Sequence, residues 1–210
     1  MIDWVVMGRV SDAKVRLMQA VADLIWAESY GSTTIDHICE KAGVKKGSFY
    51  YFFDSKADVA AAALDEEWQR HRPQLDAIFS PTVPPLERLR LYCDYGYKIQ
   101  AEMLEKCGHV LGCPLYTLGS EISTQEDRLQ RIVQEILNQK RKYLESSIRD
   151  AHAAGLIEAP DAIARAHMLF TYYQGLAMEA RIQNKLEVMK DAIRGTYELL
   201  GVSQKAVAAA

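Results

Sequence analysis

Apolar residues recur at intervals of three and four along almost every segment of this chain, which is the period of an α-helix. No stretch shows the sustained alternation, bounded by turn residues, that is typical of a β-strand. The first helix is expected after the possible N-caps Ser11 and Asp12 and before Gly31. Its apolar face would hold Val15, Met18, Val21, Ala22 and Ile25. The sequence therefore predicts an all-α protein.

Turn and cap signals divide the helical pattern. Thr34 can cap a helix over 35–42, a short helix follows over 45–52, and Ser55 with Asp58 forms a capping box for a helix that continues to about 79. The strongest break is Ser-Pro-Thr-Val-Pro-Pro at 80–85. Longer helices are expected over 85–106, 123–154, 160–184 and 186–200. We therefore expect an N-terminal three-helix domain over 1–58, a larger helical body over 59–203, and a disordered tail over 204–210.

Composition limits the classes of protein that fit. The chain has 210 residues, of which 49% are hydrophobic, and a formal net charge of -3. The length and the hydrophobic fraction are enough for one sizeable core, and the net charge excludes a polycation. Four cysteines without a secretory signal indicate a reducing compartment. No apolar run approaches the roughly 18 residues of a membrane span. These features predict a soluble, cytoplasmic protein.

The run Ala-Gly-Val-Lys-Lys-Gly-Ser-Phe-Tyr-Tyr-Phe-Phe at 42–53 is unusual for packing alone. Two short helices joined by Gly43 and Val44 fit a helix-turn-helix, whose second helix enters the DNA major groove. Lysines at the start of a helix are unfavourable for its dipole, and contacts with phosphate or guanine would explain them. Gly47 would let the backbone approach DNA, while Phe49, Phe52 and Phe53 would anchor the helix.

Positive charge is concentrated in one short part of the N-terminal region. Residues 1–58 hold seven Lys and Arg against eight Asp and Glu, but residues 41–56 hold four lysines against Asp54 alone. Nucleic-acid binding depends on such a patch and not on the global isoelectric point. The alternative, a helical hairpin with solvated lysines, fits the charge and the turn equally well.

Residues Tyr30 to Val59 resemble the DNA-binding signature of the TetR family of bacterial repressors. The matching features are a Gly, Thr-Thr, an Ile-x-x-Ile helix, Ala-Gly-Val, Lys-Gly-Ser, Tyr-x-x-Phe and Ser-Lys. Lys45 stands where a Ser commonly caps the recognition helix, and Tyr51 stands where His is frequent. The resemblance implies a homodimer that binds a palindromic DNA operator and is released by a small-molecule effector. By position, it implies DNA contacts at Thr34, Lys45, Lys46, Gly47, Ser48, Tyr50, Tyr51 and Lys56. Lys56 also begins a capped helix, whose free amides attract phosphate.

The body is expected to hold the dimer interface and an effector site. One apolar stripe would hold Ala162, Ala166, Leu169, Tyr173, Leu176 and Ala180, and a second Leu186, Met189, Ile193 and Leu200. In the family the last two helices form a bundle between subunits, and packing inside one chain is the alternative. Amphipathic side chains of the middle helices are candidates to line an effector pocket, with core packing as the alternative: Tyr95, Met103, Tyr116, Tyr172 and Tyr173.

The run from Cys107 to Ser123 holds a candidate sensor. Pro114 suits the first position of a helix, which places Cys113 at its N-cap, where a positive dipole end favours the thiolate. Cys107 and His109 lie nearby in sequence. The run resembles the region of the sensing cysteine in electrophile-responsive TetR repressors of the NemR type. Arg181 stands where those have a lysine, so the same cysteine–nitrogen linkage is not expected. A cysteine that only packs is the alternative.

Two other classes of function are open. The sequence has no Gly-rich phosphate loop, nucleophile elbow or metal-binding motif, which argues against an enzyme, a cofactor and a metal site. A helical adaptor without DNA affinity would require the lysine- and tyrosine-rich run to be incidental. The prediction is a DNA-binding transcriptional regulator, most readily a repressor released by an effector or by cysteine modification.

Overall fold

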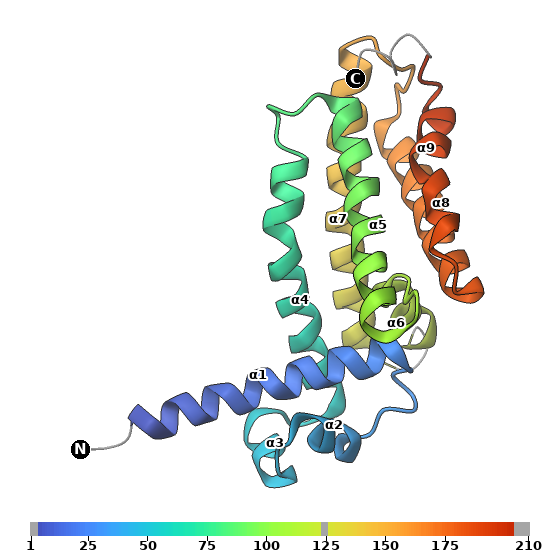
Figure 1. Cartoon of the computed structure of the whole chain (residues 1–210). Helices are drawn as coiled ribbons and strands as arrows, with labels where there is room; N and C mark the ends of the chain where they lie inside the picture. Colours follow the sequence, from blue (N-terminus) through green and yellow to red (C-terminus); the bar gives the residue numbers. More distant parts are fainter. Residues whose placement is uncertain (1–3, 123–125, 204–210) are drawn as a thin grey trace. The chain divides into compact units, whose positions relative to one another are not determined.

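The computed structural model describes residues 4–122 and 126–203, and within this part every regular element is a helix. The predicted all-α class is confirmed. The predicted tail over 204–210 lies outside the described residues. Figure 1 shows the helices in chain order. They are α1 (Trp4–Ala27), α2 (Ile35–Ala42), α3 (Lys46–Phe52), α4 (Lys56–Ile78), α5 (Pro85–Cys107), α6 (Pro114–Ile122), α7 (Asp127–Ala153), α8 (Ala162–Gln183), the 3₁₀ helix η1 (Leu186–Asp191) and α9 (Ala192–Leu200).

Two compact units share these helices. Unit 1 comprises the chain up to Arg70 together with Pro114–Glu135, and unit 2 comprises His71–Cys113 and the chain from Ile136 onward. Unit 1 therefore holds α1, α2, α3 and α6 whole, with parts of α4 and α7. The functional boundary at residue 58 stays a prediction, while the packing joins α6, far along the chain, to the N-terminal helices.

The core of unit 1 is built by the apolar face of each of its helices. In this unit α1 packs against α2, α3 and α6, and α2 packs against α3 (Figure 1). Fully buried side chains come from every one of these helices. Burying each large apolar side chain contributes about 1.5–3 kcal/mol, so this shared core fixes the short helices α2 and α3. The fully buried side chains of unit 1 include Leu17, Val21, Ile38, Phe49, Val59, Leu118, Ile122 and Leu129.

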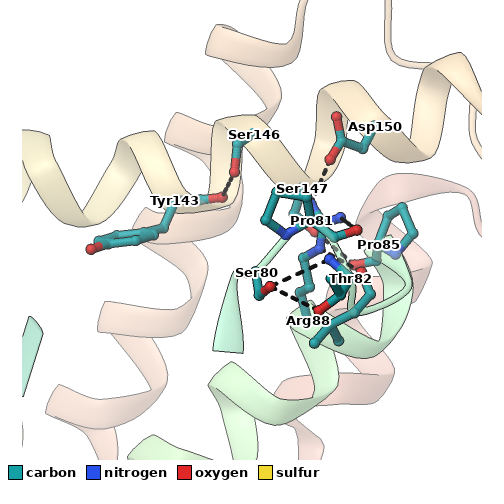
Figure 2. A network of polar contacts seen from close by, with 10 residues as sticks. Ser80, Pro81, Thr82, Pro85, Arg88, Tyr143, Ser146, Ser147 and Asp150 are labelled. Atoms are coloured by element: carbon teal, nitrogen blue, oxygen red, sulfur yellow. Dashed lines mark hydrogen bonds and ion pairs between the residues drawn. The ribbon is translucent and has the colours of Figure 1, made fainter. Parts of the chain in front are cut away.

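In unit 2, the predicted break at 80–85 is a turn that a buried arginine holds in place. Arg88 is 3% exposed, and its guanidinium donates to the carbonyls of Val83 at 2.7 Å and Pro81 at 3.3 Å. It also pairs with the carboxylate of Asp150 on α7 at 2.5 Å, and Ser147 donates to the carbonyl of Pro85 (Figure 2). A buried guanidinium needs acceptors, and these three join α5, the turn and α7.

Two of the predicted helix boundaries are wrong. Ser11 and Asp12 do not cap the first helix, because α1 begins at Trp4 and Asp12 instead pairs with Arg16 one turn later at 3.1 Å. The helix expected over 186–200 is divided into η1 and α9. At this division the Tyr172 hydroxyl donates to the carbonyl of Asp191 at 3.2 Å, a tertiary contact that helical periodicity does not reveal.

Candidate nucleic-acid interface

Helix α2 begins and ends at the residues that its sequence indicates. Thr34 is the N-cap, and its hydroxyl accepts from the backbone N–H of His37 at 3.2 Å. Gly43 adopts the left-handed conformation (φ 61°) that ends helices, and the N–H of Val44 bonds to the Cys39 carbonyl at 2.9 Å. These local bonds fix the turn between α2 and α3.

A side chain of α1 also holds this turn. The Arg16 guanidinium donates to the carbonyl of Ala42 at 3.0 Å, one of the acceptors left unpaired at the end of α2. A cation is favourable at the C-terminal end of a helix dipole. Arg16 was not singled out in the sequence, because its acceptor lies 26 residues away.

The residues predicted to contact DNA lie together on the surface of unit 1. The side chains of Phe49 and Phe53 are buried, so the opposite side of α3 faces outward, with Tyr50 51% exposed and Tyr51 74% exposed. The hydroxyls of Ser48, Tyr50 and Tyr51 have no hydrogen-bond partner within the described part of the chain. We call the exposed set the recognition surface: Thr34, Lys45, Lys46, Gly47, Ser48, Tyr50 and Tyr51.

Lys45 is the N-cap of α3 and makes no side-chain capping bond. The lysine at the usual serine position therefore leaves the start of α3 without a side-chain cap, and the side chains of Lys45 and Lys46 are exposed. Positive charge together with free amides favours an anion such as phosphate.

Gly47 has no packing role inside the chain. A Cβ built on it would meet nothing within 4 Å, and its φ is not in the left-handed region. Glycine within a helix is about 1 kcal/mol less favourable than alanine. Neither the backbone conformation nor packing in the core accounts for this cost, so the prediction that DNA approaches Gly47 closely stays open.

Lys46 carries an ion pair on this surface. Its ammonium lies 2.8 Å from the carboxylate of Asp36 on α2, and that contact raises the pKa of Lys46. Both side chains are exposed, so the pair orients the lysine more than it stabilises the fold. The sequence analysis did not identify Asp36.

Lys56 differs from the recognition surface. It is partly buried, and its ammonium donates to the carbonyls of Tyr30 at 2.8 Å and Thr33 at 2.9 Å. Burial lowers the pKa of Lys56. An ammonium has three donors, so one remains for the phosphate contact, which stays a prediction. One half of the predicted capping box is present, because the Ser55 hydroxyl accepts from the Asp58 N–H at 3.1 Å, while it donates to the Asp58 carboxylate at 2.8 Å.

The predicted effector residues are divided between the two units. Tyr116 lies on α6 in unit 1, whereas Tyr95, Met103, Tyr172 and Tyr173 belong to unit 2. Tyr95 contacts the ring of His71. Tyr173 and Tyr172 also pack against glycines, since a Cβ on Gly96 would lie 1.6 Å from the Tyr173 hydroxyl and one on Gly195 2.0 Å from that of Tyr172.

The four cysteines have different environments. Cys39 and Cys93 are buried as expected, and burial raises the pKa of the Cys93 thiol to about 12. Cys113, the candidate sensor, is also buried at 8% exposure, whereas Cys107 is exposed. The Cys107 thiol donates to the Met103 carbonyl at 3.0 Å.

The segment Gly108–Gly112, which we call the linker segment, is held by side chains of α5 and of the end of α8. Gln100 accepts from the N–H groups of Leu111 at 3.0 Å and Gly112 at 2.8 Å, and donates to the Gly112 carbonyl at 3.0 Å. Arg181 donates to the Leu111 carbonyl at 2.6 Å. Asn184 accepts from Val110 and donates to Gly108. Arg181, predicted to stand near the sensing cysteine, therefore holds the backbone that leads into α6.

The two predicted dimer stripes are largely buried within their own chain. Ala166, Leu169, Tyr173 and Ala180 of the first stripe are buried, as are Leu186, Met189 and Leu200 of the second. Helix α8 carries apolar residues on more than one face, so periodicity cannot choose the outer one. Its exposed face holds Ala164, His167, Met168, Thr171, Gly175 and Ile182.

The described residues contain no group of three or more His, Cys, Asp or Glu side chains placed to hold a metal ion. Among these residues, no helix is both long enough and apolar enough to cross a membrane.

Two family models and several known proteins match this chain. The model of bacterial regulatory proteins of the tetR family matches residues 17–63, and that of the tetracyclin repressor-like C-terminal domain matches 85–196. The transcriptional regulator AcuR of Cereibacter sphaeroides is 28% identical over 189 residues, covering 88% of this chain and 82% of its own.

Solved structures agree as well. The regulatory protein TetR from Rhodobacter sphaeroides superposes with a TM-score of 0.78 at 25% identity, over 89% of this chain and 98% of that one. The reduced form of E. coli NemR gives 0.75 at 15% identity, over 91% and 99%. At that identity the likeness to NemR shows the fold alone.

Proposed function

This chain belongs to the TetR family and is a DNA-binding transcriptional regulator, and from that premise we propose which of its surfaces perform each step. Members of the family are regulators and not enzymes. They bind operator DNA as homodimers and respond to small-molecule effectors. A protein that regulates transcription acts where the chromosome lies, and we place this one in the cytoplasm.

The recognition surface is proposed to enter the major groove. The observation that carries this proposal is the exposure of Lys45, Lys46, Ser48, Tyr50 and Tyr51 on and next to one short helix, in which Phe49 is buried. The lysines and the free amides of α3 would contact phosphate, and the hydroxyls would contact phosphate or base edges. Thr34, at the start of α2, would contact the adjacent backbone.

The exposed face of α8 is proposed to form the dimer interface. Met168 is 50% exposed and Ile182 77% exposed, which is unusual for large apolar side chains on a surface helix. A Cβ on Gly175 would meet nothing within 4 Å, so a second helix has room to approach there. Replacing Met168 by Glu is expected to yield monomers in sedimentation and to abolish operator binding, and a variant that stays dimeric would reject this face.

A reversible effector is proposed to bind in unit 2. Gln174 is 3% exposed, and its side-chain oxygen has no hydrogen-bond partner within the described part of the chain. An unpaired buried acceptor costs about 1–3 kcal/mol, which a ligand donor would recover. The aromatic rings of Tyr92 and Tyr173 lie 5.0 Å apart in the same unit. We therefore favour an effector with an apolar body and one N–H or O–H group.

Modification of Cys113 is the second proposed route of release. Helix α6 follows Cys113 directly, so a modified thiol would displace the start of that helix. The exposed Cys107 is expected to react first with a soluble electrophile, because thiol modification requires access. If the Cys113→Ser variant and the wild-type protein are released equally by hypochlorite or a quinone, Cys113 is not the sensor.

The function is tested by a gel shift with DNA that flanks the protein's own gene. We expect a retarded complex of a dimer with a palindromic site, which competitor DNA of unrelated sequence does not remove. A search of small apolar hydroxyl and amine compounds for release of this complex would then identify the effector class. Absence of any retarded complex would contradict the proposed function.

A further inference from the structure

A carboxylate on α6 binds the turn that leads into α2. Glu121 accepts the backbone N–H of Tyr30 at one oxygen, at 2.9 Å, and that of Gly31 at the other. All three residues belong to unit 1. Hydrogen bonds to a charged acceptor are about twice as strong as neutral ones, and two consecutive amides on one carboxylate fix the peptide plane between them.

The position of Glu121 is not explained by α6 itself. It lies in the last turn of α6, where negative charge is unfavourable for the helix dipole. No basic residue occupies that last turn. The backbone N–H groups of Tyr30 and Gly31 therefore offset the unfavourable interaction between the Glu121 charge and the helix dipole.

Gly31 provides an independent indication. Its φ is not in the left-handed region, so its backbone conformation is open to other residues. A Cβ at this position would, however, lie 2.6 Å from the Glu121 carboxylate. A larger residue here would therefore force the Glu121 carboxylate to shift away from the turn, whereas the turn itself does not call for glycine.

The turn is also held from its other side. The Lys56 ammonium donates to the carbonyls of Tyr30 and Thr33, and lies 4.0 Å from the centre of the Tyr30 ring. Burial, with Glu126 beside the ring, raises the pKa of Tyr30 to about 12. The N–H groups of the turn thus meet an anion and its carbonyls meet a cation, immediately before the α2 N-cap Thr34.

We propose that Glu121 is a positioning residue for DNA binding: its carboxylate sets the turn before α2, and with it Thr34 and the orientation of the recognition surface. The DNA-binding unit of this chain is then discontinuous and includes α6. This inference rests on the proposed use of the recognition surface. Glu121 itself does not touch DNA.

The test compares Glu121→Gln with Glu66→Gln in the full chain. Glu66 is exposed on α4 and makes no ion pair within the described part of the chain, so it controls for the loss of one charge. We expect Glu121→Gln to weaken operator binding about tenfold, equivalent to ~1.4 kcal/mol, and Glu66→Gln to change it less than twofold. Hydrogen exchange at the amides of Tyr30 and Gly31 should accelerate in the first variant alone, with the dimer intact.

A second variant addresses the case in which Glu121→Gln fails to fold. Gly31→Ala retains the carboxylate but displaces it, and should weaken operator binding to a similar extent. The double variant Gly31→Ala/Glu121→Gln should be no weaker than either single variant, because both remove one interaction. Unchanged exchange at the two amides, or operator binding equal to wild type despite faster exchange, would overturn the inference. Failure of the wild-type protein to bind any operator would instead reject the proposed function.

Discussion

Residues 45–51 of the recognition surface and the linker segment at 108–112 are both short runs of consecutive residues, but the hydrogen-bonding groups at the two places are used in opposite ways. On α3, the hydroxyls of Ser48, Tyr50 and Tyr51 point outward and have no partner within the described part of the chain. In the linker segment, Gln100, Arg181 and Asn184 bond backbone groups from Gly108 to Gly112. Polar groups without partners on a surface are available to bind another molecule. The hydrogen-bonded groups of the linker segment instead stabilise the fold.

The comparison predicts that loss of Gln100 has the largest effect on stability. Replacing Gln100 by Leu leaves the N–H groups of Leu111 and Gly112 and the carbonyl of Gly112 buried without this partner. Each such group costs about 1–3 kcal/mol, so the free energy of unfolding should fall by about 3 kcal/mol or more. The control is Gln183→Leu on the exposed end of α8, for which urea unfolding should show a change within about 0.5 kcal/mol. Equal effects would contradict the assigned role of Gln100.

A substitution on the recognition surface should show the reverse pattern. Gly47→Ala fills open space in α3 and should raise the free energy of unfolding by up to about 1 kcal/mol, because alanine favours helix. The same methyl group should weaken operator binding about tenfold, or ~1.4 kcal/mol, if DNA approaches this backbone. Thermal unfolding and fluorescence anisotropy measure the two effects. Operator affinity that is unchanged or improved would reject close approach at Gly47.

Sequence signals were sufficient where the interactions are local. The α2 cap at Thr34, the helix end at Gly43 and the bond of the Ser55 hydroxyl to the Asp58 N–H each join residues a few positions apart, and each is present. The burial of Phe49 and Phe53 follows from the same short pattern. The helix ends and the buried side of the helix that carry the recognition surface could therefore be predicted from the sequence.

Sequence signals were insufficient where the partner lies far along the chain. Glu121 and Tyr30 are 91 positions apart, Asn184 and Val110 are 74 apart, and only the folded chain brings them together. Helix α8 has apolar residues on several faces, so the pattern suggested Leu169 and Tyr173 for the dimer interface although both are buried within one chain. Distant polar contacts and the choice among apolar faces depend on tertiary packing.

The smallest expected effect concerns the ion pair on the recognition surface. Asp36→Asn frees Lys46 from its carboxylate partner at 2.8 Å and removes a negative charge next to the proposed DNA site. Exposed pairs are worth less than about 1 kcal/mol, so affinity for DNA should rise only about two- to fivefold, and more for unrelated DNA than for the operator. The matched control is Glu40→Gln, an exposed carboxylate on the same helix. An equal rise in both variants would show that net charge alone, and not the pair, is responsible.

The dependence of operator affinity on salt tests the central claim most directly. The logarithm of the binding constant should fall linearly with the logarithm of salt concentration, because lysines displace counterions from phosphates. Replacing Lys46 by Ala should weaken binding and reduce the slope by about one per subunit, or about two for the dimer. Lys98→Ala, an exposed lysine of α5 in unit 2, should leave both quantities unchanged. A Lys46→Ala protein with wild-type affinity and slope would contradict the assignment of α3 as the DNA-recognition helix.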